Sequence, residues 1–141
     1  MMRRTKLLFI ILLLVGSVVG VAGKSSSRSD SLEVFWQKFK AAVTTGNKLG
    51  VAALTKFPLG MSYGIPSIKN RAAFVRRYRE VFNEQADAVK CFATAKPEKD
   101  PARPREFTVA CPDAAGNEVV IYHFERTRLG WKFVALDNIN E

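Results

Sequence analysis

The chain has 141 residues, of which 48% are hydrophobic and 25% are charged. This length fits one domain and this composition is close to the globular average, so a disordered chain, a collagen-like fibre and a polytopic membrane protein are excluded. The formal net charge is +9. Whether that charge marks an anionic partner depends on where the basic residues lie along the chain.

Residues 1–23 have the order of a secretory signal peptide. A head with three basic residues precedes an apolar run over residues 7–15, and small and apolar residues follow. We predict cleavage after Ala22 or Gly23, with an uncleaved membrane anchor as the alternative. Because the three basic residues leave with the signal, the mature chain has a net charge of +6. Its predicted destination is the periplasm or the outside of the cell.

A polar segment separates the signal from the first apolar pattern. Residues 24–30 (KSSSRSD) contain no side chain that could join a core, so we interpret them as a flexible tether. The predicted folded domain therefore covers residues 31–141.

The first predicted helix covers residues 32–43. Its apolar side chains recur at helical spacing and define one buried stripe. Asp30 or Ser31 can cap its start, and Gly46 can end it in a left-handed turn. The stripe consists of Leu32, Phe35, Trp36, Phe39, Ala42 and Val43.

Two further helices are predicted, with an irregular segment between them. Asn47 can cap a short helix that ends before Pro58. Residues 57–65 contain one proline and two glycines, which favours a short edge strand or hairpin. The third helix begins near Ser67, and its apolar stripe is Phe74, Val75, Tyr78, Val81 and Phe82.

From residue 89 onward the pattern favours strands joined by short turns, which is typical of an antiparallel meander. Helices on one face of a curved antiparallel sheet of about four to six strands make an α+β two-layer domain. The predicted strands cover residues 89–95, 106–111, 118–125 and 130–136.

Cys91 and Cys111 are the two cysteines of the chain. They lie symmetrically about the connection 96–105, so in a simple hairpin they would face each other across neighbouring strands. An exported chain meets oxidising conditions, and we predict a disulfide between them. Two buried free thiols are the alternative.

Three stretches resemble the nuclear transport factor 2-like superfamily, which has a cone-shaped, cystatin-like α+β fold. They are FWQKFKAAVTTGNKLGVAALTKFPL (35–59), AAFVRRYREVF (72–82) and GWKFVALDNINE (130–141). The resemblance covers nearly all of residues 31–141 and points to an exported bacterial subgroup. It implies a site in the mouth of the cone and frequent dimerisation through the open face of the sheet. Because the superfamily includes isomerases, dehydratases and non-enzymatic binding domains, it implies no particular activity.

Aromatic side chains are the predicted walls of a ligand pocket in that cone. Most aromatic residues of a small domain belong to its core, so we expect two or three of them to reach a cavity. The expected ligand is small and apolar. The candidates are Trp36, Phe39, Tyr63, Tyr78, Tyr122, Phe124, Trp131 and Phe133.

The sequence contains no catalytic motif that assigns a reaction. An isomerase-like site needs a carboxylate base near a proton donor in an apolar pocket, and we predict no catalytic residue, no cofactor and no metal. His123 is the single histidine, for which a structural or surface role is expected. The residues that an enzyme of this kind would use are Tyr63, Tyr78 and Tyr122 as donors and Asp87, Asp113 and Asp137 as bases.

Basic residues gather on the third helix and in the connection 96–105, but acidic residues are interleaved with them. Mixed charge is typical of a solvated face, and a nucleic-acid partner is not expected. Our leading interpretation is an exported, non-catalytic domain that binds a small apolar ligand or a protein partner in the cell envelope. A homodimer through the sheet face is a further expectation. The alternative is an isomerase or dehydratase that uses Tyr and Asp in the cone.

Overall fold

A computed structural model describes residues 31–139 of the chain. The signal peptide and the tether predicted above lie outside the described residues. Within residues 31–139, no helix is both long enough and apolar enough to cross a membrane.

The N-terminal helices form where capping side chains and apolar stripes predict them. Helix α1 (Leu32–Thr44) begins after Ser31, whose hydroxyl accepts a hydrogen bond from the Val34 N–H at 3.2 Å. Helix α2 (Lys48–Ala53) is capped in the same way by Asn47. Helix α3 (Arg71–Arg79) continues directly into η1 (Glu80–Glu84), a π-helical turn.

The segment before α3 contributes an edge strand. Strand β1 (Thr55–Gly60) starts two residues before the predicted irregular segment and lies at one edge of the sheet. It pairs with β4 in the parallel direction, whereas the sequence predicted an antiparallel sheet throughout. A parallel pair requires a long crossover connection, which the helices between β1 and β4 provide.

The predicted strand over residues 89–95 is wrong, because this segment is helix α4 (Ala88–Thr94). The Asp87 carboxylate accepts a hydrogen bond from the Lys90 N–H at 3.1 Å and so caps the helix. The buried residues Ala88 and Phe92 are four apart, and Val89 is 42% exposed. A short apolar run is ambiguous between helix and strand, and the cap was the signal that favoured the helix.

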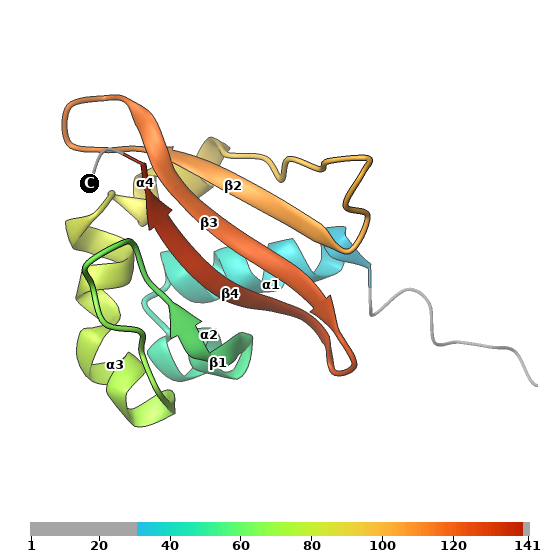
Figure 1. Ribbon diagram of the computed structural model, residues 1–141, viewed down its shortest axis with the longest axis horizontal. Coiled ribbons are helices and arrows are strands. Elements are labelled where there is room, and N and C mark those ends of the chain that lie inside the picture. Colours follow the sequence, from blue (N-terminus) through green and yellow to red (C-terminus); the bar gives the residue numbers. More distant parts are fainter. Residues whose placement is uncertain (1–30, 140–141) are drawn as a thin grey trace, which may run out of the picture.

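The remaining three strands form an antiparallel meander. They are β2 (Glu106–Pro112), β3 (Glu118–Thr127) and β4 (Gly130–Asn138), and the sheet order is β1-β4-β3-β2. Figure 1 shows the curved sheet with the helices on one side of it. The predicted α+β fold class is therefore confirmed, with four strands.

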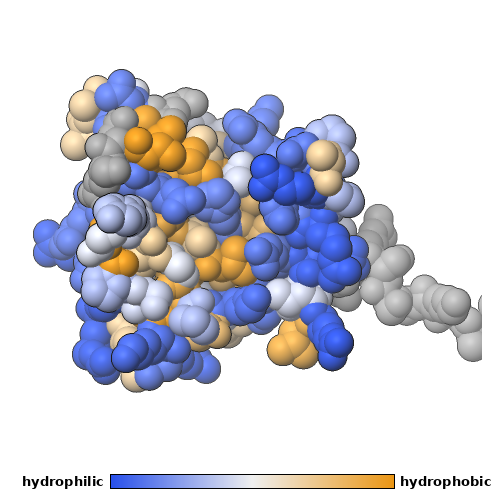
Figure 2. Space-filling model, viewed as in Figure 1, coloured by the Kyte–Doolittle hydropathy of each residue, from blue (hydrophilic) through white to orange (hydrophobic). Residues whose placement is uncertain are grey.

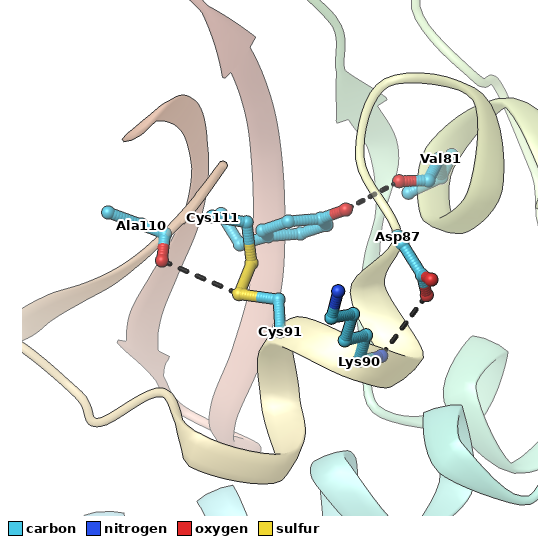
Figure 3. Close-up of a disulfide and its surroundings, with 7 residues drawn as sticks. Val81, Asp87, Lys90, Cys91, Ala110 and Cys111 are labelled. Atoms are coloured by element: carbon cyan, nitrogen blue, oxygen red, sulfur yellow. Dashed lines mark hydrogen bonds between the residues drawn. A yellow bond between two sulfur atoms is a disulfide. The ribbon is translucent and has the colours of Figure 1, made fainter. Parts of the chain in front are cut away.

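A disulfide joins α4 to β2. The Cys91 and Cys111 sulfur atoms are bonded, and the Cα atoms lie 5.7 Å apart (Figure 3). The predicted pairing is confirmed, but the predicted cross-strand geometry is wrong because Cys91 lies on a helix. Closing a loop over a sequence separation of 20 stabilises the fold by about 3 kcal/mol, chiefly through the unfolded chain.

Candidate functional site

The interior of the cone, where the predicted ligand pocket would lie, is occupied by aromatic rings. Phe39 of α1 and Tyr122, Phe124 and Phe133 of the sheet have no solvent-exposed surface. The ring centroids of Phe39 and Phe124 lie 5.0 Å apart, and those of Phe124 and Phe133 lie 5.4 Å apart. These are the distances of directly packed aromatic pairs.

The hydroxyl group of Tyr122 has a structural partner. It donates a hydrogen bond to the Val81 carbonyl of η1 at 2.8 Å (Figure 3). Burial is the main reason that the pKa of Tyr122 lies far above its ordinary value. Turns of the π-helical type frequently mark functional sites. Here the Val81 carbonyl is engaged by a core residue, so Tyr122 has no proton to offer a ligand.

The aspartates considered as bases are engaged at the surface. Asp87 caps α4, and the Asp113 carboxylate accepts hydrogen bonds from backbone N–H groups of its own turn. The Asp137 carboxylate lies 2.9 Å from Nε2 of His123 on the outer face of the sheet. Within residues 31–139, no group of three or more His, Cys, Asp and Glu residues could hold a metal.

Tyr78 lies at the border of the core. The side chain is only 6% exposed, and its hydroxyl oxygen has no hydrogen-bond partner among the described residues. Burial raises the pKa of Tyr78 to about 12. The Lys48 ammonium lies 5.6 Å above the ring centroid, within cation–π range. Tyr78, Lys48 and Arg79 contribute to the lining of a surface hollow of about 470 Å³.

Two further aromatic candidates, Trp131 and Tyr63, lie outside this ring cluster. Trp131 is 6% exposed and packs edge-to-face on Phe107 at 5.2 Å. Tyr63 is 94% exposed in the loop between β1 and α3. The structure thus places Tyr63 apart from the other candidates, which cluster in or around the core.

Trp36 lies in the floor of a groove between α1 and the segment that follows α4. The groove has a volume of about 420 Å³. None of its three lysines forms an ion pair with another described residue, and Glu33 is on the same surface. The lining thus combines apolar side chains with an excess of basic over acidic residues. Its main lining residues are Leu32, Trp36, Lys40, Lys96, Pro97 and Lys99.

A third hollow of about 760 Å³ lies beside the disulfide. Cys91 lines it from the helix side and is partly exposed, whereas Cys111 is fully buried. Glu84, Asp87 and Asp113 also line this hollow. Its lining therefore has an acidic character, which contrasts with the basic groove at Trp36.

The basic residues of α3 are partly neutralised. The Arg77 guanidinium donates to both carboxylate oxygens of Glu80, with a shortest distance of 2.7 Å. This hydrogen bonding lowers the pKa of Glu80 and raises that of Arg77. Arg79 lies 3.5 Å from Glu84. The interpretation of this helix as a mixed solvated face agrees with these pairs.

The outer face of the sheet is the other surface that the sequence singled out. Figure 2 shows apolar side chains there, interspersed with hydrophilic ones. By strand register, Ala110, Ile121 and His123 belong to this face, and each is partly exposed. The face is thus moderately apolar, with the His123–Asp137 contact within it.

Known proteins similar to this chain are found among solved structures only. No family profile matches the chain, and no curated protein matches it. Solved structures that it resembles include an NTF2-like protein with a cystatin-like fold from Novosphingobium aromaticivorans, at 14% identity over 74% of this chain and 75% of that one, with a TM-score of 0.38. A domain of unknown function with a cystatin-like fold from Nostoc punctiforme has 12% identity over 80% and 78%, with a TM-score of 0.45.

A third similar structure is a Mycobacterium tuberculosis protein in complex with estradiol-17β-hemisuccinate. It has 13% identity over 75% of this chain and 90% of that one, with a TM-score of 0.43. At such identities and TM-scores the likenesses add nothing about ligand or reaction. The exported subgroup stays a prediction.

Sequence reasoning identified Trp36 but not the groove in which it lies. The groove depends on α4, which was predicted as a strand, and on the lysines of the following connection. The cap at Asp87 is the sequence signal for α4, which leads into the connection that carries Lys96 and Lys99.

Proposed function

We propose that this chain is an exported, non-catalytic binding domain whose ligand or partner is held on its outer surface. The observation that carries this proposal is the ring cluster of Phe39, Tyr122, Phe124 and Phe133, which has no exposed surface. Catalysis in a cone of this type needs a pocket in which an acid and a base meet the substrate. Here rings take up that volume, and the tyrosine hydroxyl deepest in it is bonded to the backbone.

The groove at Trp36 is the proposed binding place. Its lining offers apolar surface, and it includes three lysines and one glutamate, Lys40, Lys96, Lys99 and Glu33. A ligand with an apolar body and one anionic end would match both features, since it would bury apolar area and neutralise unpaired charge. This refines the expected small apolar ligand to an amphipathic anion.

The groove is tested with laurate, a simple amphipathic anion, by NMR titration of the aromatic and backbone resonances. Saturable shifts are expected at the Trp36 indole and at Ala95, and none at Tyr122 or Phe133. The double variant Lys96→Gln/Lys99→Gln should weaken binding about tenfold or more, because each charge contributes about 1 kcal/mol near an anionic group.

The matched control is Lys38→Gln/Lys69→Gln, which removes the same charge from exposed positions outside the groove. This control should bind laurate like the wild type. Saturable shifts at Tyr122 and Phe133 would contradict the proposal that the cone interior is closed. An equal loss of laurate affinity in both double variants would contradict the proposal that laurate binds in the groove.

Export and self-association complete the proposal. Cell fractionation with intact-mass measurement should recover a chain that begins at Gly23 or Lys24 in the envelope or medium. A full-length mass in the membrane fraction would instead support the uncleaved anchor. The homodimer through the outer sheet face is tested by sedimentation: Ile121→Lys should shift a wild-type dimer to monomer, and a monomeric wild type would refute it.

A further inference from the structure

The hairpin between β3 and β4 presents one apolar side chain to solvent. Thr127 and Gly130 are paired, and Arg128 and Leu129 form the turn between them. Leu129 is 86% exposed. Isolated exposed leucines are common, so the surroundings of this one decide whether it has a role.

The turn is held rigidly in this conformation. The Thr127 hydroxyl donates to the Gly130 carbonyl at 2.8 Å and accepts from the Leu129 N–H at 3.1 Å. Gly130 adopts a φ of 92°, a left-handed conformation that glycine tolerates without strain. Leu129 therefore stays at the tip and does not fold back onto the sheet.

Arginines surround this tip. The Arg105 guanidinium donates to the Arg126 carbonyl at 3.0 Å, and the Arg126 N–H donates to the Arg105 carbonyl at 2.8 Å. Arg128 is next to Leu129 in the turn. All three arginines are exposed, and neither Arg105 nor Arg128 forms an ion pair with another described residue.

Acidic residues near the tip are already engaged. Glu106 lies 3.3 Å from the Arg103 guanidinium, and Glu125 lies 3.9 Å from the Lys56 ammonium. The charge of Arg105 and Arg128 is therefore not cancelled locally. Figure 2 shows mostly hydrophilic side chains at this end of the molecule.

The described chain begins at the same end. Figure 1 shows the start of α1, the start of β2 and the β3–β4 hairpin together at one end of the domain. The ring centroids of Phe35 and Phe107 lie 6.2 Å apart, and those of Phe107 and Trp131 lie 5.2 Å apart, which ties the three segments together.

We propose that this end of the domain docks on an anionic lipid bilayer. Leu129 would enter the interface between headgroups and acyl chains, and Arg105 and Arg128 would bind lipid phosphates. A basic cluster is attracted to an anionic leaflet, and an apolar side chain among the bases adds the hydrophobic contact that a purely electrostatic association lacks. Binding through one leucine and two arginines is weak and reversible.

This surface is distinct from the groove at Trp36. The docking proposal shares with the proposed function the requirement that the protein reaches the envelope. Fractionation tests export separately from lipid binding, so a protein that fails to reach the envelope is distinguished from one that reaches it but does not bind lipid.

The test is co-sedimentation with vesicles of phosphatidylcholine containing phosphatidylglycerol, and with vesicles of phosphatidylcholine alone. The protein is used as cells deliver it, its intact mass defines its N-terminus, and all variants carry the same N-terminus. Wild type should bind the anionic vesicles more tightly, and added salt should weaken this binding. Arg128→Gln should lower the partition coefficient about fivefold, the effect of one basic residue at an anionic surface. Leu129→Ser should lower it about fivefold or more, because the variant loses the apolar area that leucine buries in the interface.

Two matched control variants remove an exposed apolar side chain and an exposed arginine at positions away from the β3–β4 hairpin. Ile139→Ser removes a side chain that is 68% exposed beyond the other end of β4, and Arg76→Gln removes an exposed arginine of α3. Both should bind vesicles like the wild type. The proposal is overturned if the hairpin variants and the controls bind equally, or if neutral and anionic vesicles bind equally well. It is also overturned if inorganic phosphate at low concentration competes fully, because the site would then be a phosphate pocket.

Discussion

Replacing Phe124 with alanine should both destabilise the domain and create a binding cavity. The Phe124 ring has no exposed surface and packs against Phe107 at 4.4 Å, Phe39 at 5.0 Å and Phe133 at 5.4 Å between centroids. Removing a buried phenylalanine ring costs about 3–5 kcal/mol. Because stiff rings surround the gap and cannot collapse into it, we expect the upper part of this range.

The cost is measured by urea unfolding and by calorimetry. One kcal/mol corresponds to about 4 °C or more in a domain of this size, so the Tm should fall by at least about 12 °C. Tyr63→Ala is the control, because Tyr63 is 94% exposed and its loss should change the stability by less than about 0.5 kcal/mol.

Benzene distinguishes a filled core from a hollow one. A dry apolar cavity of ring size binds benzene, so benzene should raise the Tm of Phe124→Ala and leave that of the wild type unchanged. A wild type that is stabilised by benzene would refute the reasoning, as would a Phe124→Ala variant that loses less than about 1 kcal/mol.

Four further predictions follow from individual contacts. Reduction of the Cys91–Cys111 bond should lower the free energy of unfolding in urea by about 3 kcal/mol relative to the oxidised form. An unchanged urea midpoint would contradict a stabilising role of this disulfide between α4 and β2. Tyr122→Phe leaves the Val81 carbonyl without its donor and should cost about 1–3 kcal/mol, whereas Tyr63→Phe should cost nothing measurable. Burial raises the pKa of Tyr78 to about 12, so the folded protein keeps the Tyr78 hydroxyl proton to a higher pH than the unfolded chain does. The resulting contribution to the free energy of unfolding is complete below pH 10 and is lost as the pH rises toward 12. Ultraviolet titration should show one tyrosinate fewer in that range for Tyr78→Phe than for the wild type. The lowered pKa of Glu80 predicts that its carboxylate stabilises the folded state above pH 4.5 and that this stabilisation is lost as the pH falls through the folded-state pKa. If the free energy of unfolding of Glu80→Gln depends on acid pH as that of the wild type does, this contribution is excluded.

Much of the fold is predictable because periodicity reports burial directly. The stripe of α1 and the alternation of β3 assign Phe39, Tyr122 and Phe124 to the interior, and the structure buries all three. The segment around Cys91 was predicted wrongly because seven residues are too few for periodicity to separate a helix from a strand. The cap at Asp87 indicates a helix, whereas the disulfide is compatible with Cys91 on either a helix or a strand.

The candidate site was less predictable than the fold. Alternation places aromatic side chains on the inner face, but it cannot say whether helices leave space there or fill it. That depends on how far Phe39 and Phe92 reach across to the sheet, which is a property of packing. The groove at Trp36 combines α1 with the connection after α4, so its recognition required the correct path of α4. Leu129 lies in a predicted turn between two strands. Its proposed role in docking depends on Arg105, which is distant in sequence and could not be placed beside it from the sequence.

The rings of Tyr122, Phe124 and Phe133 are fully buried in the interior of the cone, and we propose that binding takes place outside it. The most direct measurement is NMR titration of the wild type with a steroid carboxylate, following the aromatic resonances of Tyr122, Phe124 and Phe133. We predict no change in these three residues at any concentration of the steroid. Saturable shifts or intermolecular contacts at these rings would show that the cone opens to a ligand, and would contradict the account.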